Sequence, residues 1–276
     1  MGWAASVSDI RAYNGWHPIK VTGDSLTKIN DTTFQTSKYP IVDFDYDDDV
    51  TDDVEVYVNG QAAQIQSVDA ERGLITLASA PPSDATVTAS YFFHPISDTE
   101  IKLAIAAAEA EIEAITGFKY SSETRTERHK ILSGNEFQTN APIISVSSIK
   151  IYSEGGTLID SDPDYEVLNS ELGIVRINDY RAGVLTKPYF LPFIYEVEIT
   201  YLAGAQQVPD WVKHAVIKIA TYNILLKLSS LMVLQEDYTQ ISLTFKSPEE
   251  FVKRLQHLKE EVEHIRQTLP KRGAVV

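Results

Sequence analysis

Three stretches of the chain repeat their apolar residues at the three-and-four spacing of an amphipathic helix. The first lies between Ser97, which can cap a helix, and Gly117, which can end one. The second occupies residues 208–228 and the third residues 247–270, and each has a proline in its first turn, where the missing N–H is tolerated. The pattern therefore predicts three long helices.

The third predicted helix has a narrow apolar stripe. Its apolar residues follow a strict 4-3-4-3-4 spacing, which is typical of a helix that packs along one partner. This seam either closes the core of the chain itself or packs on another copy of the chain. Its members are Phe251, Leu255, Leu258, Val262, Ile265 and Leu269.

Two other regions alternate apolar and polar residues with the period of two that half-buried strands require. In residues 54–93 the alternating runs are separated by turn signals such as Asn59-Gly60, which predicts a small β-sandwich or barrel-like module. Residues 123–202 repeat this order of strands and turns. We interpret the two regions as separate β-units that follow the same turn rules, and a duplication is the alternative.

The period changes from two to 3.6 at Ser97, so we place a domain boundary at Ile96. Residues 1–53 show no sustained helical periodicity. The expected fold is α+β, with an all-β, sandwich-like N-terminal module in residues 1–95. Residues 96–276 are expected to form a helical core with a small antiparallel β sub-structure, a C-terminal helix and a tail. We expect this second part to remain folded without the first.

The composition is that of a globular protein, with 43% hydrophobic and 23% charged residues. The net charge of −15 argues against a general nucleic-acid binder, because phosphate contacts require a basic surface. The absence of cysteine excludes disulfides and thiolate metal sites. Because no apolar run is long enough for a membrane span and the N-terminus has no signal-peptide pattern, we expect no membrane partner.

The most acidic run extends from Asp43 to Asp53 and contains seven aspartates. Its first, third and fifth residues are aspartates, as in a calcium loop. Position 6 is Asp48, where such a loop requires glycine, and position 12 is Val54, where it requires glutamate. We therefore interpret the run as a solvated acidic loop and expect no metal site.

The sequence contains no G-x-S-x-G, P-loop or G-x-G-x-x-G motif. None of the six histidines forms an H-x-x-x-H pair, and His257 and His264 are too far apart on one helix to hold a single metal. Glu109, Glu111 and Glu113 point away from one another around a helix, so they form no acid–base pair. We therefore expect a protein that is not an enzyme, has no catalytic residues and binds no cofactor.

An apolar loop is predicted in residues 185–193, between two strands. The loop contains two prolines and three large aromatic residues. Monomers seldom expose so much contiguous apolar surface, so the loop either folds back on its own sheet or contacts a neighbouring subunit. Tyr189, Phe190 and Phe193 are the candidate subunit-interface residues.

A series of motifs follows in a fixed order between residues 96 and 228. They are Ile105-Ala-Ala-Ala-Glu-Ala-Glu-Ile112 with Thr116-Gly117, Pro142-Ile-Ile-Ser-Val-Ser-Ser-Ile149, Tyr165-Glu-Val, Gly173-Ile-Val, Val197-Glu-Ile-Thr-Tyr-Leu-Ala-Gly204 and Val208-Pro-Asp-Trp-Val-Lys-His-Ala-Val-Ile217. In their order and spacing they resemble the head-tail connector, or adaptor, proteins of tailed bacteriophages. Simpler members of that family begin near the first helix, so the resemblance gives residues 1–95 no role.

The resemblance implies a structural virion protein that assembles as a ring, usually of twelve subunits, beneath the portal at the capsid vertex. The implied partners are the portal protein, the next tail or stopper protein and other copies of the chain. Phage DNA would pass through the centre of the ring without specific binding. The implied location is the head-tail junction of the virion, after assembly in the host bacterial cytoplasm. The acidic composition agrees, because a negative channel repels the DNA backbone.

In the family, the C-terminal segment docks on the portal. In this chain the segment after Pro270 combines two cations with small apolar residues, and the alternative is a frayed terminus. The candidate portal-docking residues are Lys271, Arg272, Ala274, Val275 and Val276. The alternative function for the whole chain is a tail-associated carbohydrate-binding or carbohydrate-degrading component, with the β-module binding sugar.

Overall fold

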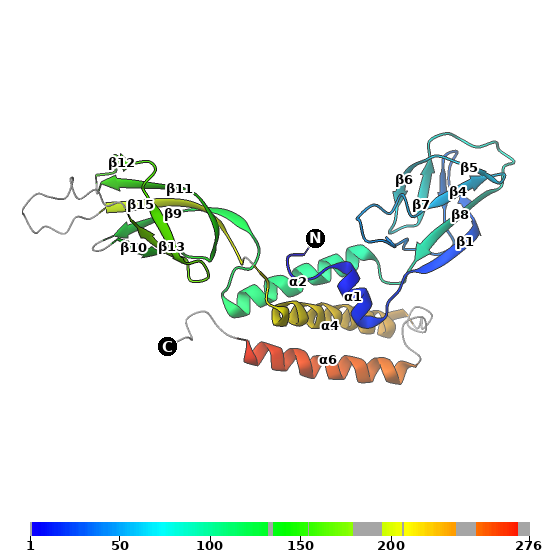
Figure 1. Cartoon of the computed structure of the whole chain (residues 1–276). Helices are drawn as coiled ribbons and strands as arrows, with labels where there is room; N and C mark the ends of the chain where they lie inside the picture. The colour runs from blue at the N-terminus through cyan, green and yellow to red at the C-terminus, as the bar shows by residue number, and fades with distance from the viewer. Residues whose placement is uncertain are drawn as a thin grey trace, which may run out of the picture. The chain divides into compact units, whose positions relative to one another are not determined.

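The computed structural model describes residues 2–131, 135–153, 155–178, 195–205, 207–235 and 247–269 (Figure 1). Its contacts divide the chain into two compact units. Unit 1 comprises Met1–Ile112 and Trp211–Leu269, and it combines a β-sandwich with the helices. Unit 2 comprises Glu113–Asp210 and Pro270–Val276, and it contains a second β-sandwich.

The β-sandwich of unit 1, here called sandwich 1, consists of two antiparallel sheets with the strand orders β1-β8-β4-β5 and β2-β3-β7-β6. Apolar residues of both sheets, such as Val56 and Ile75, belong to one buried cluster, so the module is a sandwich of open sheets and not a barrel. The strands are Ile19–Ser25 (β1), Thr27–Lys28 (β2), Thr33–Gln35 (β3), Glu55–Val58 (β4), Gln61–Ala62 (β5), Ile65–Asp69 (β6), Leu74–Leu77 (β7) and Val87–Phe93 (β8).

The first 53 residues contain a helix and three strands that the search for sustained periodicity missed. The helix α1, Val7–Asn14, begins with a capping box in which Ser6 and Asp9 bond each other's backbone N–H groups. It ends at Gly15, which has the left-handed φ of 70°. An eight-residue helix is too short to establish a period, although its capping residues could be seen in the sequence.

The β-sandwich of unit 2, here called sandwich 2, also consists of two antiparallel sheets. Their strand orders are β12-β11-β15-β9 and β10-β14-β13. Phe137 and Val175 of the smaller sheet belong to the same buried cluster as Ile149 and Ile199 of the larger one. The strands are Glu123–Ile131 (β9), Glu136–Gln138 (β10), Ile143–Ser153 (β11), Leu158–Asp160 (β12), Tyr165–Asn169 (β13), Ile174–Ile177 (β14) and Tyr195–Ala203 (β15).

The two sandwiches share one topology. The sheet β1-β8-β4-β5 corresponds strand for strand to β9-β15-β11-β12, and β3-β7-β6 corresponds to β10-β14-β13. Our interpretation of two separate units was therefore wrong, and the structure favours the duplication. The sequence did hold a signal, because Phe-Gln-Thr occurs at residues 34–36 and again at 137–139, in equivalent strands.

A buried threonine makes the same hydrogen bonds in both sandwiches. The N–H of Thr36 donates to the carbonyl of Gly73, and that of Thr139 donates to Gly173, each at 2.9 Å. Both hydroxyls donate to the carbonyl two residues ahead, at 2.9 Å from Thr36 and 2.7 Å from Thr139. Gly73 and Gly173 have φ of 63° and 69°, and a Cβ on either would overlap the threonine hydroxyl. The duplication therefore extends to individual contacts.

A carboxylate–tyrosine pair is also repeated. Tyr91 donates to Asp24 at 2.8 Å in sandwich 1, and Tyr201 donates to Glu127 at 2.7 Å in sandwich 2. Each carboxylate also accepts the N–H of the residue that follows the buried threonine, at 2.8 Å and 2.9 Å. In each sandwich these bonds tie the sheet that holds the carboxylate and the tyrosine to the chain just after the buried threonine.

The main difference between the copies is an insertion. Ile41 pairs with Phe93 and Val56 with Ala89 in sandwich 1, as Ile143 pairs with Ala203 and Ile149 with Ile199 in sandwich 2. Residues 42–55, 14 in number, therefore stand where sandwich 2 has only the five residues 144–148. The nine additional residues form most of the acidic loop.

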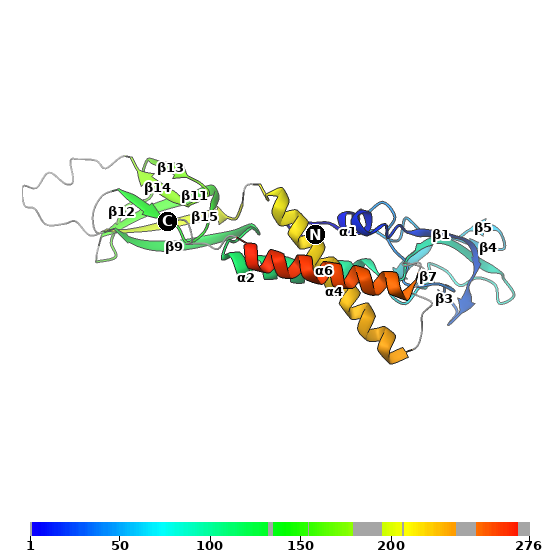
Figure 2. The same cartoon turned by 90° about the horizontal axis from the view of Figure 1, so that it is seen from below.

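Three long helices pack together in unit 1 (Figures 1 and 2). They are Asp98–Thr116 (α2, of which unit 1 includes residues up to Ile112), Asp210–Gln235 (α4) and Pro248–Thr268 (α6), which confirms the three predicted helices. One ion pair joins each pair of helices, and α1 is tied to α4 by a hydrogen bond at 2.9 Å from Asn14 to the buried Thr221. The ion pairs are Glu100–Lys227 at 3.0 Å, Glu111–Arg266 at 2.6 Å and Lys218–Glu261 at 2.9 Å.

The apolar seam of α6 closes the core of unit 1. Phe251, Leu258 and Val262 are at most 1% exposed. Of the alternatives from the sequence, packing within the chain is therefore the one observed. The helix α4 continues to Gln235, seven residues beyond the stretch 208–228 that the apolar pattern predicted. Residues 236–246 lie outside the described residues.

The α+β fold class is confirmed, with helices and antiparallel sheets side by side in the described residues. The contacts divide the chain at other positions than Ile96, because sandwich 1 belongs to the same compact unit as the long helices. That residues 96–276 remain folded without the first 95 stays a prediction.

Candidate functional site

The site residues proposed from the sequence lie outside the described residues. This holds for Tyr189, Phe190 and Phe193 at the expected subunit interface. It holds equally for the expected portal-docking residues Lys271, Arg272, Ala274, Val275 and Val276. Their roles stay predictions, so the functional surfaces must be sought in the described parts of the two units.

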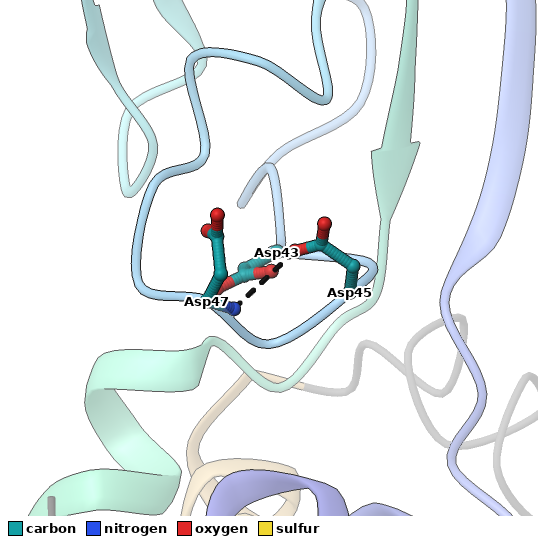
Figure 3. A group of neighbouring side chains, drawn as sticks. All are labelled: Asp43, Asp45 and Asp47. Atoms are coloured by element: carbon teal, nitrogen blue, oxygen red, sulfur yellow. Dashed lines mark hydrogen bonds between the residues drawn. The ribbon is translucent and has the colours of Figure 1, made fainter.

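The acidic loop is shaped by hydrogen bonds from its own backbone to its carboxylates (Figure 3). Asp43, only 4% exposed, accepts from the N–H groups of Tyr46 at 2.5 Å and Asp48 at 2.7 Å, one with each oxygen. Asp47 accepts from the N–H of Asp49 at 2.7 Å. Such turns are favoured by aspartate, which explains the composition of the loop without invoking an ion.

Three of these aspartates also come close enough to share a cation. Oxygen atoms of Asp43, Asp45 and Asp47 lie within 4.8 Å of one another. Asp48, at the position where a calcium loop requires glycine, has a φ of 78°, which is the conformation that glycine would supply. Both oxygens of Asp43 already accept backbone N–H groups, which competes with binding of an ion. The expectation of no metal site stays a prediction.

The acidic loop is fastened to the start of α2. Lys102 forms an ion pair with Asp48 at 2.6 Å, and this bond lowers the pKa of Asp48. The side chain of Asp98, the first residue of α2, accepts from the N–H of Asp43 at 2.8 Å. Phe44 stacks on Phe92 of β8 with ring centroids 4.2 Å apart. The loop therefore joins sandwich 1 to the helix that follows it.

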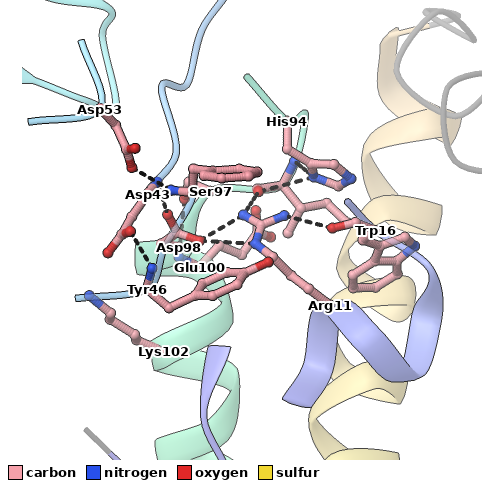
Figure 4. A network of polar contacts seen from close by, with 12 residues as sticks. Arg11, Trp16, Asp43, Tyr46, Asp53, His94, Ser97, Asp98, Glu100 and Lys102 are labelled. Atoms are coloured by element: carbon pink, nitrogen blue, oxygen red, sulfur yellow. Dashed lines mark hydrogen bonds and ion pairs between the residues drawn. The ribbon is translucent and has the colours of Figure 1, made fainter. Parts of the chain in front are cut away.

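The guanidinium of Arg11 lies at the centre of this junction (Figure 4). Arg11 is fully buried and donates from Nη2 to Asp98 Oδ1 at 2.7 Å and from Nε to the same oxygen at 3.1 Å. It also donates to the backbone carbonyls of Ile96 at 3.0 Å and Trp16 at 3.3 Å. One side chain of α1 thus holds together the chain after α1, the chain before α2 and, through Asp98, the acidic loop.

His94 lies beside Arg11 and is 4% exposed. Burial lowers the pKa of His94 to about 4, and the charge of Arg11 adds to the effect. Its Nδ1 accepts the N–H of Ile96 at 3.1 Å, which requires the neutral ring. The imidazole is therefore a structural group, held neutral at physiological pH.

In sandwich 2, Glu127 and Tyr201 have shifted pKa values for structural reasons. Burial raises the pKa of Glu127, but hydrogen bonds from Asn140 and Tyr201, together with His129, outweigh it and lower the pKa. Burial and the bond to Glu127 raise the pKa of Tyr201 to about 12. Neither residue lines the cavity of unit 1 or the groove of unit 2 that are described in the next paragraph. Neither has a pKa near neutral pH, as a general acid or base would require.

Unit 1 contains a small cavity of about 140 Å³ beside the acidic loop. It is lined by residues of the start of α1, by Asp43, Tyr46 and Asp48 of the loop, and by Asp98 and Lys102 of α2. Unit 2 has a larger groove of about 550 Å³ between β11 and β13. The groove is lined by Ile143–Val146 and by Tyr165 and residues 167–171.

The helices of unit 1 also expose large apolar side chains. Leu103 of α2 is 67% exposed, Leu226 of α4 is 48% exposed and Val252 of α6 is 57% exposed. The ion pair Glu100–Lys227 joins α2 to α4 close in sequence to Leu103 and Leu226. Among the described residues, no helix has the length and apolar character to cross a membrane.

Comparison with known proteins gives no family but does give likenesses to solved structures, two of which are described here. No family model and no curated protein matches the chain. The structure titled "Neck of empty GTA particle computed with C6 symmetry" contains a chain that is 18% identical, with 45% of this chain and 65% of that chain covered and a TM-score of 0.29. This chain thus spans just under two thirds of that neck chain.

The second likeness is to a chain in "Virion of native gene transfer agent (GTA) particle". It is 17% identical, with 58% of this chain and 77% of that chain covered and a TM-score of 0.31. Both similar structures are phage-like particles. At these TM-scores neither likeness carries an argument about this chain.

Proposed function

We propose that this protein is a non-enzymatic structural component of a phage-like virion, a connector that forms a ring between the portal and the tail. The observation that carries the proposal is the ordered set of motifs in residues 96–228 that resembles the head-tail adaptors. In the structure these motifs fall, in chain order, on or just before α2, β11, β13, β14, β15 and α4.

The described residues offer an assembly surface more readily than an active site. The strongly shifted groups, His94 and Tyr201, are buried and serve internal hydrogen bonds. Leu103, Leu226 and Val252 remain exposed on an isolated chain, and a ring would bury such side chains between copies. The net charge of −15 suits a channel through which DNA slides without sticking.

Within this function, the tail after α6 is assigned to the portal. Lys271 and Arg272 would face an acidic surface, and Ala274, Val275 and Val276 would enter a pocket. Removal of residues 271–276 is expected to leave folding intact and to weaken binding to the portal protein. The double variant Lys271→Glu with Arg272→Glu is expected to weaken binding more at low salt than at high salt, because screening shortens the reach of charge.

Lys253→Glu is the matched control, because it reverses an exposed lysine on α6 and leaves the tail unchanged. Equal portal binding by the full chain and the truncated chain would contradict portal docking and favour the alternative, in which the tail is a frayed terminus. Affinity for glycans by a chain that never assembles would favour the carbohydrate-binding or carbohydrate-degrading component instead.

A further inference from the structure

Comparison of the two copies shows that sandwich 2 lacks the loop that sandwich 1 carries at the equivalent position. In sandwich 1 the connection from Ile41 to Val56 carries the acidic loop, and Val50 of this loop packs against the core of the sandwich. In sandwich 2 the equivalent connection is the first half of β11, from Ile143 to Ile149. This stretch forms one wall of the 550 Å³ groove.

Both walls of the groove present strand edges without a partner strand. β13 pairs with β14 on one side, and no described strand pairs with its other side. β11 pairs with β15 along its length, whereas β12 reaches only Ile151 and Tyr152 on the opposite edge. The N–H of Ile143 already donates to the carbonyl of Ser170, which also lines the groove, at 2.8 Å. In the described part of the chain, the edge of β11 from Ser145 to Ile149 has no partner strand and is available to an added strand.

Most of the accessible surface of the groove is polar, apolar side chains lie at its floor, and its surroundings are acidic. Val146, Tyr165 and Val167 line it and pack on the core of sandwich 2, and Leu168 lines it with 37% exposure. Residues 158–171 contain five acidic residues and no basic one. Arg176, the cation on neighbouring β14, is already engaged by Glu136 at 2.7 Å.

We propose that this groove binds an extended segment of a partner protein that adds as a strand to sandwich 2. The segment would carry apolar residues at alternate positions, for the apolar floor, and basic residues at its ends, for the acidic surroundings. The volume lies in the range of natural ligand pockets, and the insertion in sandwich 1 shows that this fold accepts an apolar side chain from a chain laid beside the core. In this proposal the two copies differ in role: sandwich 1 is bonded to α2 through its acidic loop, and sandwich 2 binds the partner segment.

The test measures binding of a labelled peptide to the full chain by fluorescence anisotropy. The probe is Lys-Val-Thr-Val-Thr-Val-Lys with blocked ends, and its comparison peptide has Glu at both ends. Binding of the basic probe, at least about tenfold tighter than that of the acidic one at low salt, is expected. N-methylation of alternate residues should abolish binding when the methyl groups face a strand edge, because the donors of the added strand are lost.

Two leucines give a matched pair of variants. Leu168→Lys places a charge in the groove and should weaken binding at least about tenfold, because a floor contact is lost. Leu172→Lys changes a leucine that is 49% exposed and does not line the groove, so it should leave the affinity within about twofold. Both positions are exposed, so neither variant should disturb folding. Hydrogen exchange at Ser145 and Val146 should slow on binding.

Three results would overturn the proposal. The first is no binding of the basic probe at millimolar concentration, and the second is equal loss of binding in the two leucine variants. The third is tighter binding of a peptide with the sequence of residues 270–276, because the occupant would then be the tail of this chain and not a partner segment. These results concern sandwich 2 alone, so ring formation and portal binding remain separate measurements.

Discussion

Replacement of Arg11 by methionine should destabilise unit 1 and leave unit 2 unchanged. Methionine fills much of the same space but leaves Asp98 without its cation and the carbonyls of Ile96 and Trp16 without their donor. Breaking a buried pair by removing one partner costs about 3–5 kcal/mol. Asp98 keeps the N–H of Asp43 and its favourable place in the first turn of α2, so the lower end, about 3 kcal/mol, is expected.

Tryptophan fluorescence isolates this effect, because the three tryptophans, Trp3, Trp16 and Trp211, all belong to unit 1. For a unit of this size, a loss of about 3 kcal/mol lowers the melting temperature by roughly 6–12 °C. Adding Asp98→Asn to the variant should restore about 1–2 kcal/mol, because the uncompensated charge is then gone. A loss below about 1 kcal/mol, or a double variant no more stable than Arg11→Met alone, would refute the reasoning.

Three further predictions concern individual groups. Thr139→Val should destabilise unit 2 by about 1–3 kcal/mol, seen by circular dichroism with the tryptophan transition unchanged, whereas Thr36→Val should move the tryptophan transition. An equal effect of both variants on one transition would contradict the assignment of one stabilising threonine to each sandwich. His94 has a pKa of about 4 when folded and about 6.5 when unfolded, so the unfolded chain binds more protons between these values. Unit 1 should therefore lose stability, by up to about 3 kcal/mol, as the pH falls from 6.5 to 4, and His94→Gln should lose less over that range. If the His94→Gln variant lost as much stability over this pH range, the pH dependence would arise from other groups. Calcium and a chelator should leave the melting temperature unchanged, and a calcium-dependent rise of several degrees would show a bound ion at Asp43, Asp45 and Asp47.

The sequence predicted the elements whose pattern is long and regular. The helices α2, α4 and α6 and the strand β15 repeat their period often enough to be recognised, and Gly117 ends α2 with the expected left-handed φ of 69°. The helix α1 was missed because eight residues contain barely two turns. β2 and β3, with two and three residues, are too short to alternate visibly.

The junction around Arg11 could not be predicted from the pattern. An arginine in a short segment usually lies in water, and its burial depends on Asp98, 87 residues away in the chain, and on two backbone carbonyls. The duplication was underestimated for another reason. The nine-residue insertion after Ile41 shifts the register of the two copies, so the matching strands do not align at one constant spacing.

The mass of the assembly tests the proposed connector most directly. One chain has a mass of 30.8 kDa, and a ring of twelve would have a mass of about 370 kDa. The protein would be mixed with the portal protein of the same particle and measured by mass photometry, with electron microscopy of the same sample. The account predicts closed rings of many copies attached to the portal. A chain that stays monomeric at every concentration and does not associate with the portal would contradict it.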